Sequence, residues 1–271
     1  MKARSGAAQA SPDHVVVLKV PTPGAFLHTM FATAATRRAL VAEMLGTLLF
    51  VFVAAGTTLM TAAAAAERGS LTRVLVVALA HGLAFALAVA ATSRLSGGHL
   101  NPAITAGAVA TGRMPMNVGA MFVAAQVVGA VLAAVLLKAV VPGAMTNGLG
   151  GHVLGPRVTP EAAIVVEAVV TFALVLAFLA TANVARATAP MVLGAVVALG
   201  HLFAMPLTGA SMNPARSFGP ALVAGAWTAQ WVYWIGPLLG AGLAALAWKW
   251  AFAGPHEKEP RIINGDDPWR D

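Results

Sequence analysis

Long apolar runs separated by short polar segments organise this chain. Six of these runs approach the about 20 residues that a helix needs to cross about 30 Å of hydrocarbon. They lie at about residues 39–62, 74–93, 117–140, 162–183, 190–207 and 228–252. The pattern therefore predicts six membrane-spanning helices.

Two shorter apolar segments begin at Asn101 and Asn213. Each follows turn-forming residues, at 96–98 and 208–211, and each has proline where the first helical turn would start. At about ten residues these segments are too short to span a bilayer, and irregular backbone at that depth persists only when it is buried in protein or faces a water-filled cavity. We expect two half helices that enter from loops and line a polar path.

The two halves of the chain share their landmarks. In order, these landmarks pair Glu43 with Glu167, Thr47 with Thr171, His81 with His201, Asn101 with Asn213, and Gln126 with Pro237. Each half holds three predicted spans, an odd number, so the second copy must cross the membrane inverted. The predicted fold class is an all-α membrane protein with six transmembrane helices plus two re-entrant half helices, whose N-termini meet near the middle of the bilayer.

The composition supports this class. The chain of 271 residues is 59% hydrophobic and 10% charged, whereas a soluble domain carries about 25% charged residues. Its formal charge of +7 comes from basic residues scattered through flanks and loops, which argues against nucleic acid as a partner. The absence of cysteine excludes disulfides, thiolate metal sites and cysteine nucleophiles.

The basic residues indicate an orientation, because Lys and Arg accumulate on the cytoplasmic side of a membrane. Those close to predicted span ends on one side are Arg37, Arg38, Arg113, Arg186 and Lys249. We therefore expect a multi-pass protein of the inner or plasma membrane, with both termini in the cytoplasm and the lipid bilayer as a partner. The alanine-rich composition favours a bacterial source.

Residues 96–105 and 213–221 resemble the aquaporin, or major intrinsic protein, family in its water-channel type. The tripeptide Asn-Pro-Ala occurs in both segments, as Asn101-Pro102-Ala103 and Asn213-Pro214-Ala215. Arg216 follows the second copy directly. The resemblance covers about residues 38–252. It implies a right-handed bundle, a homotetramer with a separate pore in each subunit, and passive passage of water or small neutral solutes without ions or protons.

On this resemblance the chain divides into three parts. Residues 1–37 form a cytoplasmic N-terminal tail, residues 38–252 form the channel domain, and residues 253–271 form a cytoplasmic C-terminal tail. Within the channel domain, the first repeat covers about residues 38–140 and the second about residues 162–252.

Elementary electrostatics also favours a pore at the two motifs. Opposed helix N-termini place about half a positive charge each at the pore centre, which disfavours cations. Asn101 and Asn213 can each present an amide N–H to a passing water oxygen, so that the water hydrogens point away along the file and the proton wire is interrupted. The alternative is that both side chains only cap their helices, although capping and pore lining are compatible.

The resemblance assigns a selectivity filter to His81, His201, Ala210 and Arg216. An arginine within a span is costly unless it meets water or carbonyl oxygens, and a fixed positive charge in a narrow mouth repels cations. The alternatives are an Arg216 whose charged end reaches the interface and a His201 that only packs in the core. His81 departs from the usual water-channel pattern, which resembles Phe at this position, and widens and polarises the filter.

The same residues bear on the identity of the permeant. Glycerol-type members resemble a pattern with a small residue at the position of His201 and with Asp where this chain has Ser217. The prediction is therefore a channel for water. The alternative is a broader, aquaglyceroporin-like channel for small neutral solutes such as glycerol, hydrogen peroxide or ammonia.

Glu43 and Glu167 are carboxylates within predicted spans, where ionisable residues are functional by default. The resemblance implies instead that they brace the re-entrant loops by accepting hydrogen bonds from backbone N–H groups. Proton relay is the alternative.

Other classes of function find less support. An intramembrane enzyme needs a nucleophile or a metal set at helical spacing, and His99, His152 and the two carboxylates lack that spacing. We therefore predict no catalytic residue, no metal site and no cofactor. A proton-coupled transporter needs titratable groups at the midplane, where this chain has asparagine, and a sealed structural junction would gain from an apolar filter.

Overall fold

The computed structural model describes residues 34–64, 70–143, 147–181 and 188–252. Their regular secondary structure is entirely helical, which confirms the predicted all-α class. In chain order the elements are α2 (Ala34–Ala63), α3 (Leu71–Ser96), α4 (Pro102–Ala110), α5 (Met116–Val140), the 3-10 turn η2 (Asn147–Gly150), α6 (Pro160–Thr181), α7 (Ala189–Thr208), α8 (Pro214–Ala224), α9 (Val232–Ala247) and the π-helical turn η3 (Trp248–Phe252).

The long helices follow the predicted spans. Five of them, α2, α3, α5, α6 and α7, are long and apolar enough to cross a membrane. The sixth predicted span is α9, which continues without a break through η3 to Phe252. It begins at Val232 and not near residue 228, because the chain from Gly225 to Trp231 is still in turns.

The first helix begins earlier than the apolar pattern predicts. α2 starts at Ala34, so both Arg37 and Arg38 lie within the helix, although the apolar run begins only at about residue 39. Alanine and arginine are strong helix formers, and helical hydrogen bonding does not stop where the apolar run stops. The rest of the predicted N-terminal tail lies outside the described residues, as do Arg186 and the predicted C-terminal tail.

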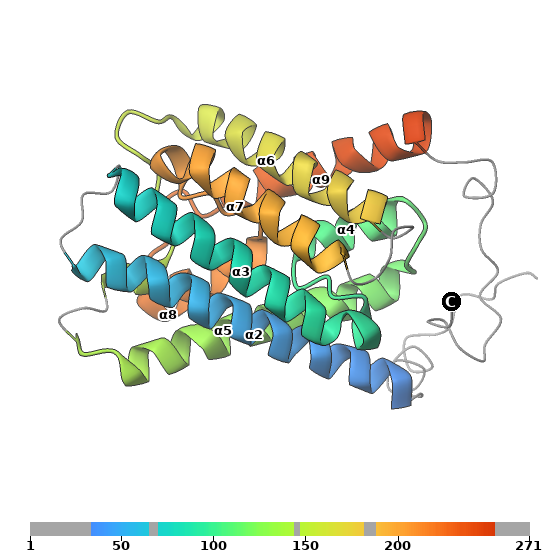
Figure 1. Ribbon diagram of the computed structural model, residues 1–271, viewed down its shortest axis with the longest axis horizontal. Coiled ribbons are helices and arrows are strands. Elements are labelled where there is room, and N and C mark those ends of the chain that lie inside the picture. Colours follow the sequence, from blue (N-terminus) through green and yellow to red (C-terminus); the bar gives the residue numbers. More distant parts are fainter. Residues whose placement is uncertain (1–33, 65–69, 144–146, 182–187, 253–271) are drawn as a thin grey trace, which may run out of the picture.

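The half helices α4 and α8 lie among the long helices and enter from opposite ends of the bundle (Figure 1). α4 has nine residues and α8 has eleven, so neither can cross a membrane by itself. α4 packs against α9, and α8 packs against α5. Each half helix therefore rests on the third long helix of the opposite repeat.

Small residues allow the long helices to approach closely. α3 and α7 meet at Gly82 and Gly194, where a Cβ atom on either glycine would lie 2.6 or 2.5 Å from the carbonyl oxygen of the other. α2 packs on α5 through Gly129, and α6 packs on α9 at the equivalent Gly240. Close backbone approach of this kind is the usual basis of helix packing within a membrane.

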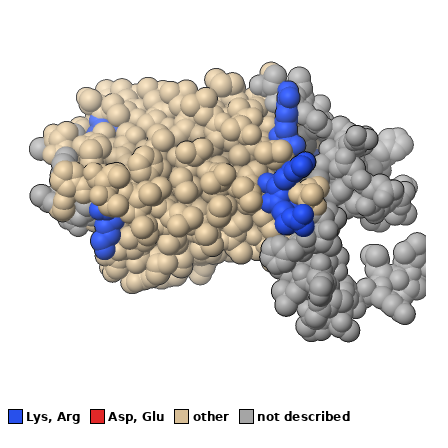
Figure 2. Space-filling view, turned by 90° about the horizontal axis from the view of Figure 1, so that it is seen from below, with Lys and Arg blue, Asp and Glu red and all other residues tan. Residues whose placement is uncertain are grey.

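The outside of the bundle is apolar. Large side chains such as Leu87 of α3 and Leu199 of α7 are exposed. Figure 2 shows a broad band without charged side chains, with Lys and Arg near the two ends of the molecule. A surface of this kind suits the hydrocarbon core of a bilayer.

Candidate functional site

Each half helix begins at a motif asparagine. Asn101 and Asn213 are the N-caps of α4 and α8, and proline follows each of them. Asn101 Oδ1 accepts a hydrogen bond from the Ala103 N–H at 2.8 Å. Asn213 Oδ1 accepts from the N–H groups of Ala215 and Arg216 at 3.0 and 3.2 Å. Both asparagines therefore satisfy N–H groups that the start of a helix leaves unpaired.

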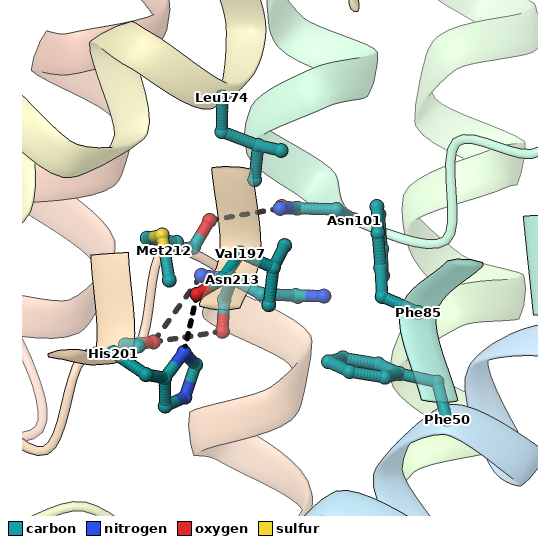
Figure 3. Close-up of a pocket in the computed structure, with 9 residues that line it drawn as sticks. Phe50, Phe85, Asn101, Leu174, Val197, His201, Met212 and Asn213 are labelled. Carbon is teal, nitrogen blue, oxygen red and sulfur yellow. Dashed lines mark hydrogen bonds between the residues drawn. The ribbon is translucent and has the colours of Figure 1, made fainter. Parts of the chain in front are cut away.

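The amide nitrogens of the same two side chains reach across to the opposite half of the chain. Asn101 Nδ2 donates to the carbonyl oxygen of Met212 at 2.8 Å, a bond drawn in Figure 3. Asn213 Nδ2 donates to the carbonyl oxygen of Leu100 at 2.9 Å. Because a side-chain amide carries two N–H groups, each asparagine keeps one for a molecule beside it.

Glu43 of α2 binds the loop that precedes Asn101. Its carboxylate accepts hydrogen bonds from the backbone N–H groups of His99 at 3.0 Å and Leu100 at 2.7 Å. It also accepts from the hydroxyl of Ser96 at 2.6 Å. Glu43 is fully buried, and these bonds offset part of the cost of burying its carboxyl group.

Glu167 of α6 repeats this arrangement in the second half. Its carboxylate accepts from the N–H groups of Ser211 at 2.9 Å and Met212 at 2.8 Å, and from the hydroxyl of Thr208 at 2.6 Å. Met212 and its counterpart Leu100 both have left-handed backbone, at φ +52, which is unfavourable for residues with a side chain. On each of these two residues a carboxylate holds the N–H group and the opposing asparagine holds the carbonyl oxygen.

The two carboxylates differ in one hydrogen-bond donor. Gln126 of α5 donates from Nε2 to Glu43 at 2.7 Å and to the hydroxyl of Thr105 at 3.0 Å. Its counterpart in α9 is Pro237, which has no side-chain donor. Glu43 therefore accepts from one more group than Glu167 does.

In the second half a histidine from outside the repeats takes part. Ser217 Oγ, the counterpart of the Thr105 hydroxyl, lies 2.5 Å from Ser211 Oγ and 2.8 Å from His152 Nδ1. Ser211 donates its own hydrogen to the Asn213 carbonyl oxygen at 3.0 Å, so Ser217 must donate to Ser211 and His152 must donate to Ser217. This role of His152 was not predicted from the sequence, because the residue lies between the repeats and has no counterpart in the first half.

His81 of α3 and His201 of α7 lie side by side, with ring centroids 4.0 Å apart and a tilt of 39°. Their Nδ1 atoms lie 2.8 and 2.9 Å from the carbonyl oxygens of Val77 and Val197. A carbonyl oxygen only accepts hydrogen bonds, so Nδ1 carries the hydrogen in both rings and Nε2 of a neutral ring is an acceptor. His201 Nε2 is buried and has no partner among the described residues.

Arg216 extends from the first turn of α8 toward His81. Its NH2 group donates to the Gly150 carbonyl oxygen at 2.9 Å and lies 3.4 Å from His81 Nε2. Its Nε and NH1 groups have no acceptor within the described ranges, although the side chain is only 1% exposed. Ala210 is buried in the loop between α7 and α8, and its methyl side chain offers no hydrogen-bond donor or acceptor. The structure thus brings Arg216 and both histidines together.

A cavity of about 10 Å³, enough for about one water molecule, lies beside the two asparagines. The residues that line it, drawn in Figure 3, are Phe50, Phe85, Asn101, Leu174, Val197, His201, Ser211, Met212 and Asn213. Phe50 and Leu174 were not among the site residues predicted from the sequence. Both lie seven residues after a repeat glutamate, so the register of the repeat was a signal that could have found them.

A second cavity, of about 270 Å³, is lined by residues that bond to His81 and Arg216. Its lining includes Val77 and Gly150, whose carbonyl oxygens hold His81 and Arg216, together with Arg73. In the part of the chain that the structure describes, no group of three or more His, Cys, Asp or Glu side chains could hold a metal ion. The site is therefore a polar cluster in which His201 lines the smaller cavity and His81 and Arg216 bond to residues that line the larger one.

Comparison with known proteins gives the same family throughout. The Major intrinsic protein family matches residues 30–248. The chain is 43% identical to Aquaporin TIP4-4 of Zea mays over 240 residues, which cover 86% of this chain and 95% of that protein. It is 39% identical to Aquaporin TIP2-1 of Arabidopsis thaliana over 229 residues, which cover 83% of this chain and 92% of that protein.

A solved structure agrees in fold. The aquaglyceroporin from Plasmodium falciparum superposes with a TM-score of 0.73 at 20% identity, covering 82% of this chain and 98% of that chain. At this identity the likeness concerns the fold alone. The family match and the apolar helices identify a multi-pass membrane protein. From its sequence, its inverted repeat and its paired motifs, the chain belongs to the major intrinsic protein family.

Proposed function

We propose that this chain is a channel for the passive permeation of water that excludes ions and protons. The observation that carries the proposal is the reciprocal bonding of Asn101 and Asn213, which leaves one amide N–H of each beside a cavity with room for about one water molecule. The relatives named aquaporins support the same function.

The paired asparagines supply a physical reason for proton exclusion. The N-terminal ends of α4 and α8 meet beside them, and each carries about half a positive charge. A water molecule that accepts hydrogen bonds from both amides directs its own hydrogens away along the file. A proton that moves by successive transfers therefore meets a reversed hydrogen-bond chain at this point.

The outer constriction suits a molecule that both accepts and donates hydrogen bonds. Arg216 offers its Nε and NH1 donors, and His201 offers Nε2 as an acceptor. His81 and the Gly150 carbonyl oxygen hold the remaining guanidinium nitrogen. Water satisfies both kinds of group, whereas a cation meets the fixed positive charge of Arg216.

The size of the passage favours water over glycerol. Phe50 and Phe85 line the smaller cavity, with ring centroids 5.2 Å apart, and its volume of about 10 Å³ has room for about one water molecule. Hydrogen peroxide and ammonia are closer to water in size and are the additional permeants that His81 and Ala210 favour. We assign the selectivity filter to His81, His201, Ala210 and Arg216.

We assign Glu43 and Glu167 to bracing the re-entrant loops and not to proton relay. Each accepts hydrogen bonds from two successive backbone N–H groups and from a hydroxyl. Neither residue lines the two cavities described above. A relay would need contact with water, whereas a brace needs the donors that are present.

We further propose a homotetramer in an inner or plasma membrane, with a channel domain at residues 38–252 and both termini in the cytoplasm. α2 begins and η3 ends at the same end of the bundle (Figure 1). Arg37, Arg38 and Lys249 lie near that end, as expected of a cytoplasmic face. The exposed apolar faces of the long helices are available to neighbouring subunits as well as to lipid.

Stopped-flow light scattering of vesicles that contain the full chain tests the proposed function. Under an impermeant osmotic gradient we expect fast shrinkage with a low activation energy, and under a glycerol gradient we expect no reswelling. Arg216→Val should still pass water but admit protons, because it removes the fixed charge at the constriction. Asn213→Asp should weaken cation exclusion, because it places a carboxylate between the helix ends.

Two outcomes would overturn the proposal. Shrinkage no faster than that of empty vesicles would exclude a water channel. Rapid glycerol-driven reswelling would replace the water-selective pore with the broader channel.

A further inference from the structure

Three of the six tryptophans of the chain lie within residues 227–234, at the turn that joins α8 to α9. Trp227 and Trp231 are 50% and 49% exposed. Trp234 follows on the first turn of α9 and is half-buried. The C-terminal end of the second half helix is therefore followed by a cluster of large aromatic side chains.

This cluster is in contact with the half helix that carries Arg216. The ring of Phe218 packs edge-on against Trp227 and Trp234, at centroid distances of 5.7 and 6.2 Å. Residues two positions apart in an α-helix point about 200° apart around its axis. Since Arg216 points toward the histidines, Phe218 points away from them. Opposite sides of α8 therefore carry the arginine of the proposed filter and the contact with the aromatic cluster.

The exposed tryptophans at the two ends of the continuous helix formed by α9 and η3 are spaced to match a bilayer. Trp231 directly precedes α9, and Trp250 of η3 is 87% exposed at the other end of the same helix. At about 1.5 Å per residue, the helix rises about 28 Å between them, close to the about 30 Å of the hydrocarbon core. The large exposed side chains between them include Ile235, Leu239, Leu243 and Leu246.

Tryptophan concentrates at the boundary between hydrocarbon and headgroups, because an indole combines a large apolar ring with one polar N–H. The spacing assigns Trp231 to one boundary and Trp250 to the other. Trp227, in the same turn as Trp231, then lies at the boundary on the side of the filter.

The first half helix is held differently. The turn after α4 contains Arg113, whose NH1 group donates to the carbonyl oxygen of Leu179 at the end of α6 at 2.8 Å. The guanidinium group also lies 4.9 Å from the centroid of the Trp248 ring. α4 is thus tied to other helices of the protein, whereas the turn after α8 presents its aromatic side chains outward.

We propose that Trp227 and Trp231 anchor the outer end of α8 in the headgroup and glycerol layer of the bilayer, and that this anchor sets the position of Arg216. The partner is the interfacial layer of phospholipid, and the contact runs from the lipid through the tryptophans and Phe218 to α8. The effect on permeation rests on the proposed water-channel function, whereas the depth of the tryptophans does not.

Fluorescence quenching tests the depth of the anchor. The full chain and W227F/W231F are reconstituted with phosphatidylcholine brominated either near the headgroup or near the end of the acyl chain. The difference in fluorescence between the two proteins gives the emission of Trp227 and Trp231. We expect bromine near the headgroup to quench this emission more strongly than bromine near the end of the acyl chain. Equal or stronger quenching by deep bromine, or quenching by aqueous acrylamide alone, would overturn the anchor.

Water permeability in bilayers of short, intermediate and long acyl chains tests the coupling to Arg216. We expect the permeability per channel of the natural sequence to change by about twofold or more across the series, because a change of thickness displaces interfacial anchors. W227L/W231L should lose most of this dependence, and W227Y/W231Y should keep it, because tyrosine is also an interfacial residue.

L243A is the matched control, since it removes an exposed apolar side chain from the middle of α9, between the two boundaries, and should keep the dependence of the natural sequence. A W227L/W231L variant with unchanged thickness dependence would overturn the coupling, and so would a natural sequence that shows no dependence. If the natural sequence passes no water in any bilayer, the proposed function fails, and the quenching measurement still decides the anchor.

Discussion

The imidazole rings of His81 and His201 lie with their centroids 4.0 Å apart. They come from equivalent positions of the two repeats, and each is fixed by a bond from Nδ1 to the carbonyl oxygen four residues earlier. Arg216 removes this equivalence, because its NH2 group lies against His81 Nε2 and leaves His201 Nε2 without a partner among the described residues. One arginine thus gives two similarly placed rings different hydrogen-bond partners.

The first prediction concerns His81. We expect His81→Phe to lower the permeability to neutral solutes larger than water several-fold, since a larger apolar ring narrows and depolarises the constriction. The Arg216 NH2 group would keep the Gly150 carbonyl oxygen as its acceptor, so water flux should persist. Stopped-flow measurements with hydrogen peroxide and urea check this, and unchanged solute permeability would count against it.

The second prediction compares the two carboxylates. Replacing glutamate by glutamine turns one acceptor oxygen into a donor, and each buried donor left facing it costs about 1–3 kcal/mol of folding free energy. Glu43 Oε2 accepts from both Leu100 N–H and Gln126 Nε2, whereas Glu167 Oε2 accepts from Met212 N–H alone. Glu43→Gln should therefore lower the thermal unfolding temperature in detergent more than Glu167→Gln does, and the opposite order would contradict this account.

The third prediction concerns the contact between α3 and α7. Gly82→Ala would place a methyl group 2.6 Å from the Gly194 carbonyl oxygen, and overpacking of this kind costs about 1–3 kcal/mol. Gly242→Ala is the matched control, because a Cβ atom there meets nothing within 4 Å. We expect Gly82→Ala to reduce thermal stability and Gly242→Ala to leave it unchanged or higher. Equal unfolding temperatures for the two variants would argue against close contact at Gly82.

The fourth prediction concerns mercury. The chain contains no cysteine, so mercury should not block water flux by binding a thiol. Ala210→Cys adds a thiol in the buried loop between α7 and α8, at a position that we propose for the filter, and we expect mercury to block this variant and a reducing agent to restore it. Strong reversible block of the natural sequence would contradict the prediction.

Much of the fold could be predicted because its causes are local in the sequence. Hydrocarbon requires apolar runs of a set length, and proline after asparagine starts a helix, so the spans and both half helices follow from the pattern. The predicted start of the first helix, at about residue 39, was wrong. Hydropathy marks the part of a helix that lies in hydrocarbon, whereas the helix itself begins at Ala34 and includes Arg37. The repeat also indicates the inversion, because an odd number of spans permits nothing else.

By itself the sequence thus determined the class, the repeat and the residues of the two motifs. The tertiary structure alone decided which groups meet. Asn101 bonds to the carbonyl oxygen of Met212, which is 111 residues away, and His152 reaches Ser217 from a loop that belongs to neither repeat. A hydrogen bond depends on distances of a few tenths of an ångström between elements remote in sequence, and no hydrophobic period or local motif carries that information.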